Sequence, residues 1–200
     1  MTEGRVLAVF DWDGTLAEGD CLFPFLVAVA GPAACALTWG AALGEGVAGP
    51  GDATGKDLRT RVKEAWVRRL LQGRPLAEVR EVARTRLRPQ RRWRTFMHAT
   101  LERHHAAGHD VLIASGALDV CMDALLDDVP HTDRLCTSLE TRDGILTGSF
   151  TAEGNCVRNR KAERVAAWIA DHGPYATTWG YGNLPHDLPM LNLLDNRVVV

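Results

Sequence analysis

Two carboxylates lie two residues apart, directly after a short apolar stretch near the start of the chain. Residues 6–10 are apolar, Asp11 and Asp13 follow, and Asp13-Gly14 is a turn signal. Side chains at this spacing project from the same side of an extended chain. Two buried carboxylates repel each other and lose hydration unless a cation compensates them. The stretch predicts a metal-assisted nucleophile at the edge of a parallel sheet, although a polar turn after a strand has the same local pattern.

Other groups that suit phosphoryl transfer follow along the chain. This reaction needs a nucleophile, an acid for the leaving oxygen, a cation for the phosphate charge, and donors that orient the phosphate. Asp11 is the candidate nucleophile, and Asp13 can protonate the leaving alcohol and later activate water. Ser115 and Gly116 follow the predicted strand 111–114, which they are expected to end. They offer a hydroxyl and a backbone N–H to phosphate oxygens, although Ser-Gly is also a common turn.

Lys161, Asn183 and Asp187 complete the set of candidate site residues. Lys161 is near the start of a predicted helix, where its ammonium group and the helix end both favour an anion. Asn183 and Asp187 lie on a loop after the predicted strand 176–180 and offer the oxygen ligands that Mg²⁺ prefers. Taken alone, Lys161 is an ordinary solvated lysine, and its place in the series is what makes it a candidate.

Four stretches, in order, resemble the motifs of the haloacid dehalogenase (HAD) superfamily: residues 10–16, 112–115, 155–161 and 182–191. The third stretch and the predicted hairpin 137–148 are similar to the phosphoserine-phosphatase-like branch, subfamily IB. The resemblance implies an α/β fold: a three-layer Rossmann-like core with a mostly parallel sheet, plus a helical C1-type cap inserted after the first strand. It also implies a Mg²⁺-dependent phosphatase that works through an aspartyl-phosphate.

The resemblance assigns roles to the candidate residues. Asp11 is then the nucleophile, Asp13 the general acid and base, and Ser115 and Lys161 bind the phosphoryl group. The implied Mg²⁺ ligands are Asp11, Asp13 through its backbone carbonyl, Asn183 and Asp187.

Two positions depart from the family pattern. Asn183 stands where the family usually has an acidic residue, so it keeps an oxygen ligand but not the charge, and metal affinity or turnover is expected to be lower. Arg158 lies near a position where the branch often has glycine.

The layout predicted from the sequence is a catalytic core of residues 1–17 and 108–200, with a helical cap of residues 18–107 between them. A cap that emerges beside the active-site edge is well placed to act as a lid and to select substrates. Within it, Glu18 could face a cationic group, because an acidic residue near this position contacts the substrate amine in phosphoserine phosphatases. A solvated Glu18 is the competing interpretation.

Apolar residues at helical spacing, together with turn signals, predict the secondary structure in more detail. The cap is expected to hold helices over residues 56–72, 75–88 and 89–107 and a loop over 44–55. The core is expected to hold strands over 135–141 and 145–150, joined by an Asp143-Gly144 turn.

The composition is that of a soluble globular protein, with 46% hydrophobic and 24% charged residues in a chain of 200. The net charge of −2 gives no general attraction to nucleic acid, and the arginines of residues 80–94 are interpreted as solvated and paired with acids. Five scattered cysteines fit reduced thiols in a cytoplasmic protein. His104, His105 and His109 are interpreted as surface residues, since no further zinc ligand is evident.

An uncharged run over residues 21–44 raises the question of a membrane span, but Gly31-Pro32 interrupts it and favours two short helices. Three functional hypotheses follow. The first is a phosphatase acting on a small phosphorylated metabolite. The second is a lipid phosphate phosphatase of the phosphatidylglycerophosphate type, motivated by this run. The third is a phosphate-sensing protein with weak or lost turnover, motivated by Asn183.

Overall fold

A sheet of five parallel strands forms the centre of the computed structural model, which describes residues 4–48 and 57–200. The strand order is β3-β2-β1-β6-β7, so the chain leaves β1 for one side of the sheet and later returns to the other. This confirms the predicted α/β class with a mostly parallel sheet. The strands are β1 (Val6–Phe10), β2 (Asp110–Leu118), β3 (Asp133–Thr137), β6 (Thr177–Gly182) and β7 (Asn196–Val199).

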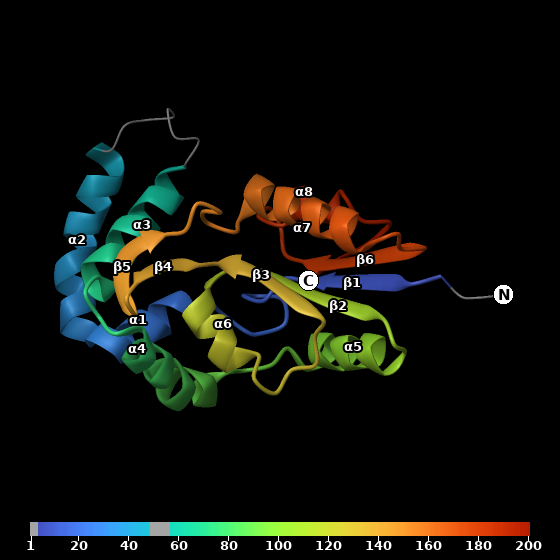
Figure 1. Cartoon of the computed structure of the whole chain (residues 1–200), viewed down its shortest axis with the longest axis horizontal. Coiled ribbons are helices and arrows are strands. Elements are labelled where there is room, and N and C mark those ends of the chain that lie inside the picture. The colour runs from blue at the N-terminus through green and yellow to red at the C-terminus, as the bar shows by residue number, and fades with distance from the viewer. Residues whose placement is uncertain (1–3, 49–56) are drawn as a thin grey trace.

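Helices cover both faces of this sheet, which gives three layers (Figure 1). Leu7 and Val9 of β1 pack with the helices α7 (Arg158–His172) and α8 (Leu188–Leu191). Ala8 and Phe10 point the other way, to the side of α5 (Thr95–Ala106) and α6 (Asp119–Leu125). A strand buried on both faces needs apolar residues at every position, which explains the continuous apolar run before Asp11.

The remaining helices lie beyond the carboxyl end of the strands (Figure 1). They are α1 (Leu22–Ala30), α2 (Pro32–Ala48), α3 (Leu58–Leu71) and α4 (Leu76–Val82), followed by the short helical turns η1 (Ala83–Leu87) and η2 (Arg88–Gln90). Gly31 has a φ of +83° and joins α1 to α2, as the sequence predicted. Within the described ranges, no single helix is long and apolar enough to span a membrane; α1 and α2 meet that criterion only together, and their axes differ by 118°.

A two-stranded antiparallel hairpin packs against these helices and not against the sheet. It consists of β4 (Leu139–Arg142) and β5 (Ile145–Phe150), and its turn is the predicted Asp143-Gly144. Both turn residues have positive φ, the conformation of tight two-residue hairpins. Leu146 exchanges backbone hydrogen bonds with Gly73 and Arg74, which fixes the hairpin beside α3.

The division into core and cap at residues 17/18 and 107/108 remains a proposal. Two packing contacts cross it: α5 lies within residues 18–107 yet packs against β2, and the hairpin lies within 108–200 yet packs against α3.

Several predicted boundaries were wrong. The strand predicted over 135–141 is two strands that separate at Ser138, because β3 pairs with β2 while β4 pairs with β5. The helix predicted over 89–107 begins only at Thr95. The residues before it run beside the segment after β1 instead, where the Arg94 N–H donates to the Leu16 carbonyl.

A loop, a strand end and two histidines also differ from the prediction. α2 continues to Ala48, so the loop predicted over 44–55 does not begin at Gly44; its residues 49–55 lie outside the described ranges. β2 continues to Leu118, so Ser115 and Gly116 do not end it. His104 and His109 are half-buried: the ring of His104 packs edge-on against Phe10, and the Nδ1 atoms of the two histidines lie 2.8 Å apart.

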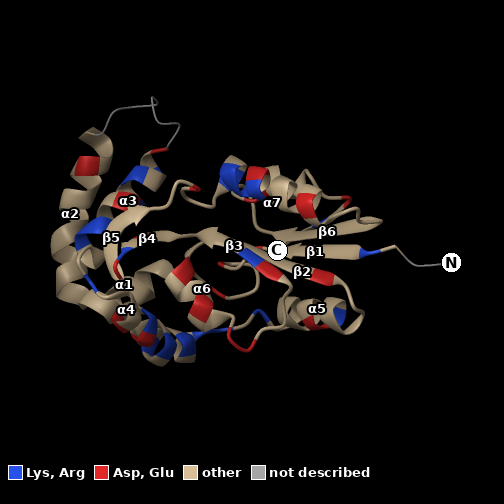
Figure 2. Ribbon diagram, in the orientation of Figure 1, with Lys and Arg blue, Asp and Glu red and all other residues tan. Residues whose placement is uncertain are grey.

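The arginines of residues 80–94 lie beside acidic residues of α6 and the loop after it (Figure 2). Arg88 pairs with Asp127 and Asp128, and Arg91 pairs with Asp128 through both guanidinium nitrogens. This confirms, for Arg88 and Arg91, the prediction that acids elsewhere in the chain pair with the arginines of this stretch.

Candidate active site

Sheet register brings the candidate residues together at the carboxyl ends of β1 and β6. Phe10 pairs with Ile113 of β2 on one side and with Tyr181 of β6 on the other. The Asp11 N–H donates to the Tyr181 carbonyl at 2.9 Å, so Asp11 leaves the sheet beside the start of the loop that carries Asn183. This is the point at which the strand order reverses, where ligands of open α/β sheets bind.

A buried lysine joins two buried carboxylates at the centre of the site. Lys161 Nζ lies 2.7 Å from Asp11 Oδ1 and 2.6 Å from Asp187 Oδ1. Burial disfavours the ammonium, but the two carboxylates outweigh it and raise the pKa of Lys161. Burial also raises the pKa of Asp11, although Lys161 opposes this. The three side chains carry a net charge of −1 when ionised, so the site is set to receive a further cation.

Asp13 is held in place by Cys21, at the start of the helical insertion. Its Oδ1 accepts a hydrogen bond from the Cys21 N–H at 3.0 Å, and its Oδ2 accepts one from Cys21 Sγ at 3.5 Å. Burial, followed by the nearby charges of Asp20 and Asp11, raises the pKa of Asp13 to about 7. A carboxyl group with this pKa exchanges a proton readily near neutral pH, as a general acid must.

Oxygen atoms converge around the Asn183 amide. Asn183 Nδ2 lies 2.9 Å from the Asp13 carbonyl oxygen, 3.3 Å from Asp11 Oδ2 and 3.4 Å from Thr15 Oγ1. Rotating the amide by half a turn presents its oxygen to the same place, because the two ends of an amide have nearly the same shape.

The donor set around Asn183 fits Mg²⁺, which prefers oxygen ligands and few carboxylates. In the described part of the chain, no three Asp, Glu, His or Cys side chains form a metal cluster. Asp11, the Asp13 carbonyl, Asn183 and Asp187 are the groups that could hold such an ion.

The loop after β6 is shaped around Asp187. Asp187 Oδ2 accepts a hydrogen bond from the Asn183 N–H at 2.9 Å, while its Oδ1 contacts Lys161. A Cβ atom on Gly182 would lie 2.7 Å from the Asp187 Cβ, closer than real Cβ contacts allow. Only glycine at this position lets the carboxylate turn back into the site.

Of the two residues predicted to bind phosphate, Ser115 lies in the interior and Gly116 lines the cavity. Ser115 is fully buried, and its Oγ accepts a hydrogen bond from the Ala117 N–H at 3.1 Å. Gly116 and Ala117 line the cavity, and Ser115 is not among the lining residues.

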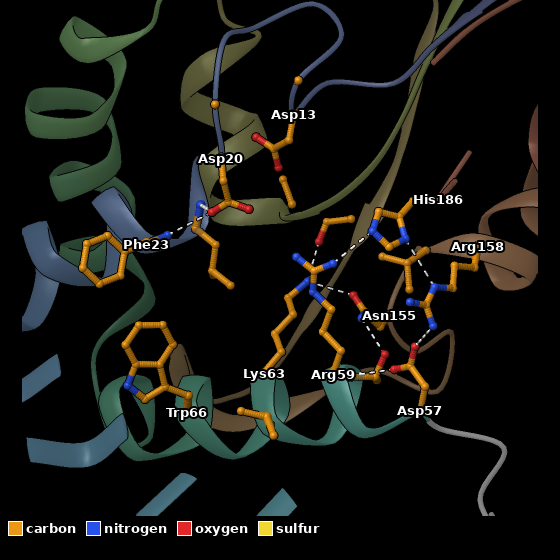
Figure 3. A pocket seen from close by; sticks show the side chains of 18 of the residues that line it. Asp13, Asp20, Phe23, Asp57, Arg59, Lys63, Trp66, Asn155, Arg158 and His186 are labelled. Carbon is orange, nitrogen blue, oxygen red and sulfur yellow. Dashed lines mark hydrogen bonds and ion pairs between the residues drawn. The ribbon is translucent and has the colours of Figure 1, made fainter. Parts of the chain in front are cut away.

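A cavity of 1610 Å³ opens from these residues toward α1, α2 and α3. Asp11, Asp13, Lys161, Asn183 and Asp187 all line it. Figure 3 shows its outer part, where Lys63, Arg59 and Trp66 extend from α3.

The structure places Glu18 away from this cavity. Its side chain is exposed and lines a smaller hollow of 600 Å³, and its backbone N–H donates to the Arg92 carbonyl. Asp20, two residues further on, is the acid of this segment that lines the larger cavity. The loop between them turns at Gly19, which has a φ of +79°.

Several residues that contact the site were not predicted from the sequence. Thr15 Oγ1 donates to Asp11 Oδ2 at 3.0 Å, and its place inside the first motif was the available signal. Lys63 carried no local signal, because its contacts join segments far apart in the chain. Cys21 carried none either, although it lies only eight residues after Asp13. Lys63 Nζ donates to the Gly116 carbonyl and, at 2.8 Å, to Asn155 Oδ1.

Comparison with known families agrees with this geometry. A family model of haloacid dehalogenase-like hydrolases matches residues 8–192. The chain therefore belongs to this family. Among curated proteins it is similar to the histidinol-phosphatase of Neisseria meningitidis serogroup C (strain 8013), with 28% identity over 105 residues. The match covers 50% of this chain and only 47% of that relative, so it spans about half the length of each.

Solved structures show the same fold at lower identity. A protein of unknown function from Bordetella pertussis Tohama I aligns with a TM-score of 0.75 and 23% identity, over 98% of this chain and 90% of that one. A phosphoserine phosphatase holding an analogue of its phospho-aspartyl intermediate aligns with a TM-score of 0.64 and 16% identity, over 98% and 86%.

Proposed function

We propose that this hydrolase is a Mg²⁺-dependent phosphomonoesterase that works through an aspartyl-phosphate on Asp11. The observation that carries the proposal is the buried group of Asp11, Lys161 and Asp187, with Asp13 beside it. Lys161 holds one oxygen of Asp11, and Thr15 and the Asn183 amide contact the other. These contacts fix the carboxylate for in-line attack on phosphorus.

The proposed reaction has two steps. An Asp11 oxygen attacks phosphorus while the bond to the leaving alcohol breaks, and the alcohol oxygen takes the proton from Asp13. Asp13, now ionised, then accepts a proton from water as the water oxygen attacks the phosphorus, which releases inorganic phosphate and restores Asp11. A pKa of about 7 suits Asp13 to both transfers.

Lys161 is the cation that this chain itself places beside the phosphate. Lys161 donates hydrogen bonds to phosphate oxygens, with the Gly116 backbone as a further donor at the cavity wall. The oxygen set around Asn183 would hold Mg²⁺, and the ion would supply positive charge that offsets the carboxylate and phosphate charges.

The proposed substrate is a small phosphorylated metabolite, in a cytoplasmic setting. The histidinol-phosphatase and phosphoserine phosphatase likenesses support this class. All five cysteines are free and buried, which fits a reducing compartment.

The proposal is tested by phosphate release from a panel that includes para-nitrophenyl phosphate, histidinol phosphate and phosphoserine. We expect release with Mg²⁺, none with EDTA, and none from Asp11→Asn. The matched control is Asp127→Asn, which removes a surface carboxylate and should keep full activity. No release from any ester, together with tight binding of vanadate, would instead favour the phosphate-sensing protein.

A lipid phosphate phosphatase is the second candidate, and exposed apolar residues favour it. Phe23, Trp39 and Leu43 are 57%, 46% and 42% exposed, and all three line the cavity. Such side chains can contact acyl chains at a bilayer surface. Phosphate release from phosphatidylglycerophosphate in mixed micelles, and sedimentation with anionic vesicles, would support this candidate. Absence of both would remove it.

A further inference from the structure

Three residues on one face of α3 point into the cavity beyond the site described above. Arg59, Lys63 and Trp66 follow one another at spacings of four and three, and all of them line the cavity (Figure 3). Two like charges four residues apart on a helix repel each other. Among residues 4–48 and 57–200, no carboxylate forms an ion pair with Arg59 or Lys63. The exposed Arg59 therefore presents a positive charge without an ion-pair partner to the cavity, whereas the charges of Asp13 and Asp20 act on Lys63.

A second guanidinium meets Arg59 across one imidazole. Arg59 Nη1 lies 3.0 Å from His186 Nε2, and Arg158 Nε lies 3.4 Å from His186 Nδ1. Figure 3 shows His186 between the two arginines. They come from separate elements: Arg59 from α3, Arg158 from the first turn of α7, and His186 from the loop before α8.

The hydrogen-bond donors of this cluster outnumber its acceptors. A guanidinium only donates, and a neutral imidazole accepts at one nitrogen and donates at the other. One of the two contacts therefore brings an N–H against an N–H. Asp57 pairs with Arg158, which leaves Arg59 with no anionic partner in the described part of the chain. The cluster has a surplus of donors and of positive charge.

An anion would correct both deficits at once. A carboxylate or phosphate offers several acceptor oxygens, and guanidinium groups bind such anions through paired hydrogen bonds. The reacting phosphoryl group does not serve, because Lys161 and the residues around Asp11 bind it. Since both sets of residues line one cavity, a substrate held at Asp11 can carry a second anionic group to this cluster.

We propose that Arg59, Arg158 and His186 form a subsite for a second anionic group, a phosphate or a carboxylate, on the phosphomonoester. This inference rests on the proposed phosphatase function. Lys63 lies one turn after Arg59 and contacts the Gly116 carbonyl, so it connects the subsite with the predicted phosphate site. The substrate class is then a phosphate ester with a second acid group.

Matched substrate pairs test the subsite. Each pair is an alkanediol bisphosphate and the ω-hydroxyalkyl phosphate of the same chain length, over a series of lengths. For the wild type we expect a KM about tenfold lower for the bisphosphate at one or more lengths. The double variant Arg59→Met/Arg158→Met should lose this preference while keeping kcat/KM for the monophosphate within about twofold. Carboxyalkyl phosphates in the same series show which acid group is preferred.

The control is Arg69→Met, on the same helix, whose partner is Glu45 and which does not line the cavity. It should keep the preference. Equal KM values within every pair, or a preference that survives the double substitution, would overturn the inference.

Binding measurements separate this inference from the proposed function. If neither the substrate pairs nor para-nitrophenyl phosphate is hydrolysed, the phosphatase proposal fails. Calorimetry with the same pairs then still shows whether the subsite binds a second anionic group. Tighter binding of the bisphosphate to Asp11→Asn, lost when Arg59→Met and Arg158→Met are added, supports it. Equal affinity for both members of each pair overturns it.

Discussion

At the scale of single residues, Lys161 compensates the two buried carboxylates at the centre of the site. It is 3% exposed and is the only cation in contact with Asp11 and Asp187 in the described ranges. Removing one member of a buried ionic group leaves an uncompensated charge, which costs far more than an exposed ion pair contributes.

We therefore expect Lys161→Met to abolish activity and to lower the free energy of unfolding by about 3–5 kcal/mol, as measured by urea titration at neutral pH. Adding Asp187→Asn should restore part of the stability and none of the activity, because it removes one of the repelling carboxylates. An unchanged unfolding midpoint for Lys161→Met would show that the carboxylates are not charged together.

His104 gives the fold a pH dependence that is separate from catalysis. Its Nε2 lies 2.8 Å from the Tyr181 hydroxyl, and burial, followed by the charges of His109 and Arg103, lowers its pKa to about 4. The folded state therefore resists a proton that the unfolded state accepts near pH 6.5. This costs nothing above pH 7, and the loss of stability grows as the pH falls from about 6.5 to 4.

We expect this loss to be on the order of 1–2 kcal/mol, less than the full shift implies because the ring is only half-buried. Denaturant unfolding at several pH values checks it. His104→Gln should flatten the curve between pH 6.5 and 4, whereas His105→Gln, at the exposed neighbour, should not. Equal slopes for both variants would contradict the assignment.

At the scale of elements, α3 begins where it does because Asp57 caps it. Asp57 Oδ1 accepts a hydrogen bond from the Thr60 N–H at 2.7 Å, which satisfies one of the free donors of the first turn. The start of α3 sets which of its residues face the cavity, so the cap also positions Arg59 and Lys63.

We expect Asp57→Ala to lower the free energy of unfolding by about 1 kcal/mol, measured in urea. Asp57→Asn keeps an acceptor oxygen and should lose much less, which separates capping from the ion pair with Arg158. If both variants lose the same free energy of unfolding, the negative charge of Asp57 stabilises the protein and the cap hydrogen bond does not.

At the scale of the whole molecule, Asn155 connects the insertion to the sheet. Its Nδ2 donates to Thr60 Oγ1 at 3.1 Å, and its Oδ1 accepts from Lys63 and from Thr137 of β3. The network is buried at Asn155 and Thr137, so its groups have no water to replace a lost partner.

Asn155→Ala should therefore lower the free energy of unfolding by about 2 kcal/mol and raise KM more than it lowers kcat, because Lys63 loses its anchor beside Gly116. Unfolding in urea and steady-state kinetics check the two parts. The control is Asn159→Ala, an exposed position on α7, which should change neither. A fall in kcat with KM unchanged would place Asn155 in the chemistry.

The amino-acid sequence by itself determined the local features of this protein. An apolar strand followed by Asp11 and Asp13, the Gly31-Pro32 break and the Asp143-Gly144 turn depend on backbone preferences and on spacing. The α/β class followed from the alternation of elements and from the family resemblance. All of these features depend on a few neighbouring residues or on a pattern that repeats along the chain, so they can be predicted from the sequence.

The tertiary structure decided what depends on distant segments. Lys161 meets Asp11 across 150 positions, and His186 meets Arg59 across 127. Asp20, and not Glu18, lines the larger cavity, and the backbone N–H of Glu18 is bonded to the Arg92 carbonyl far along the chain. No local pattern specifies such contacts, because the packing of helices against the sheet fixes them. The neighbours of a side chain across the fold also set its charge and its pKa.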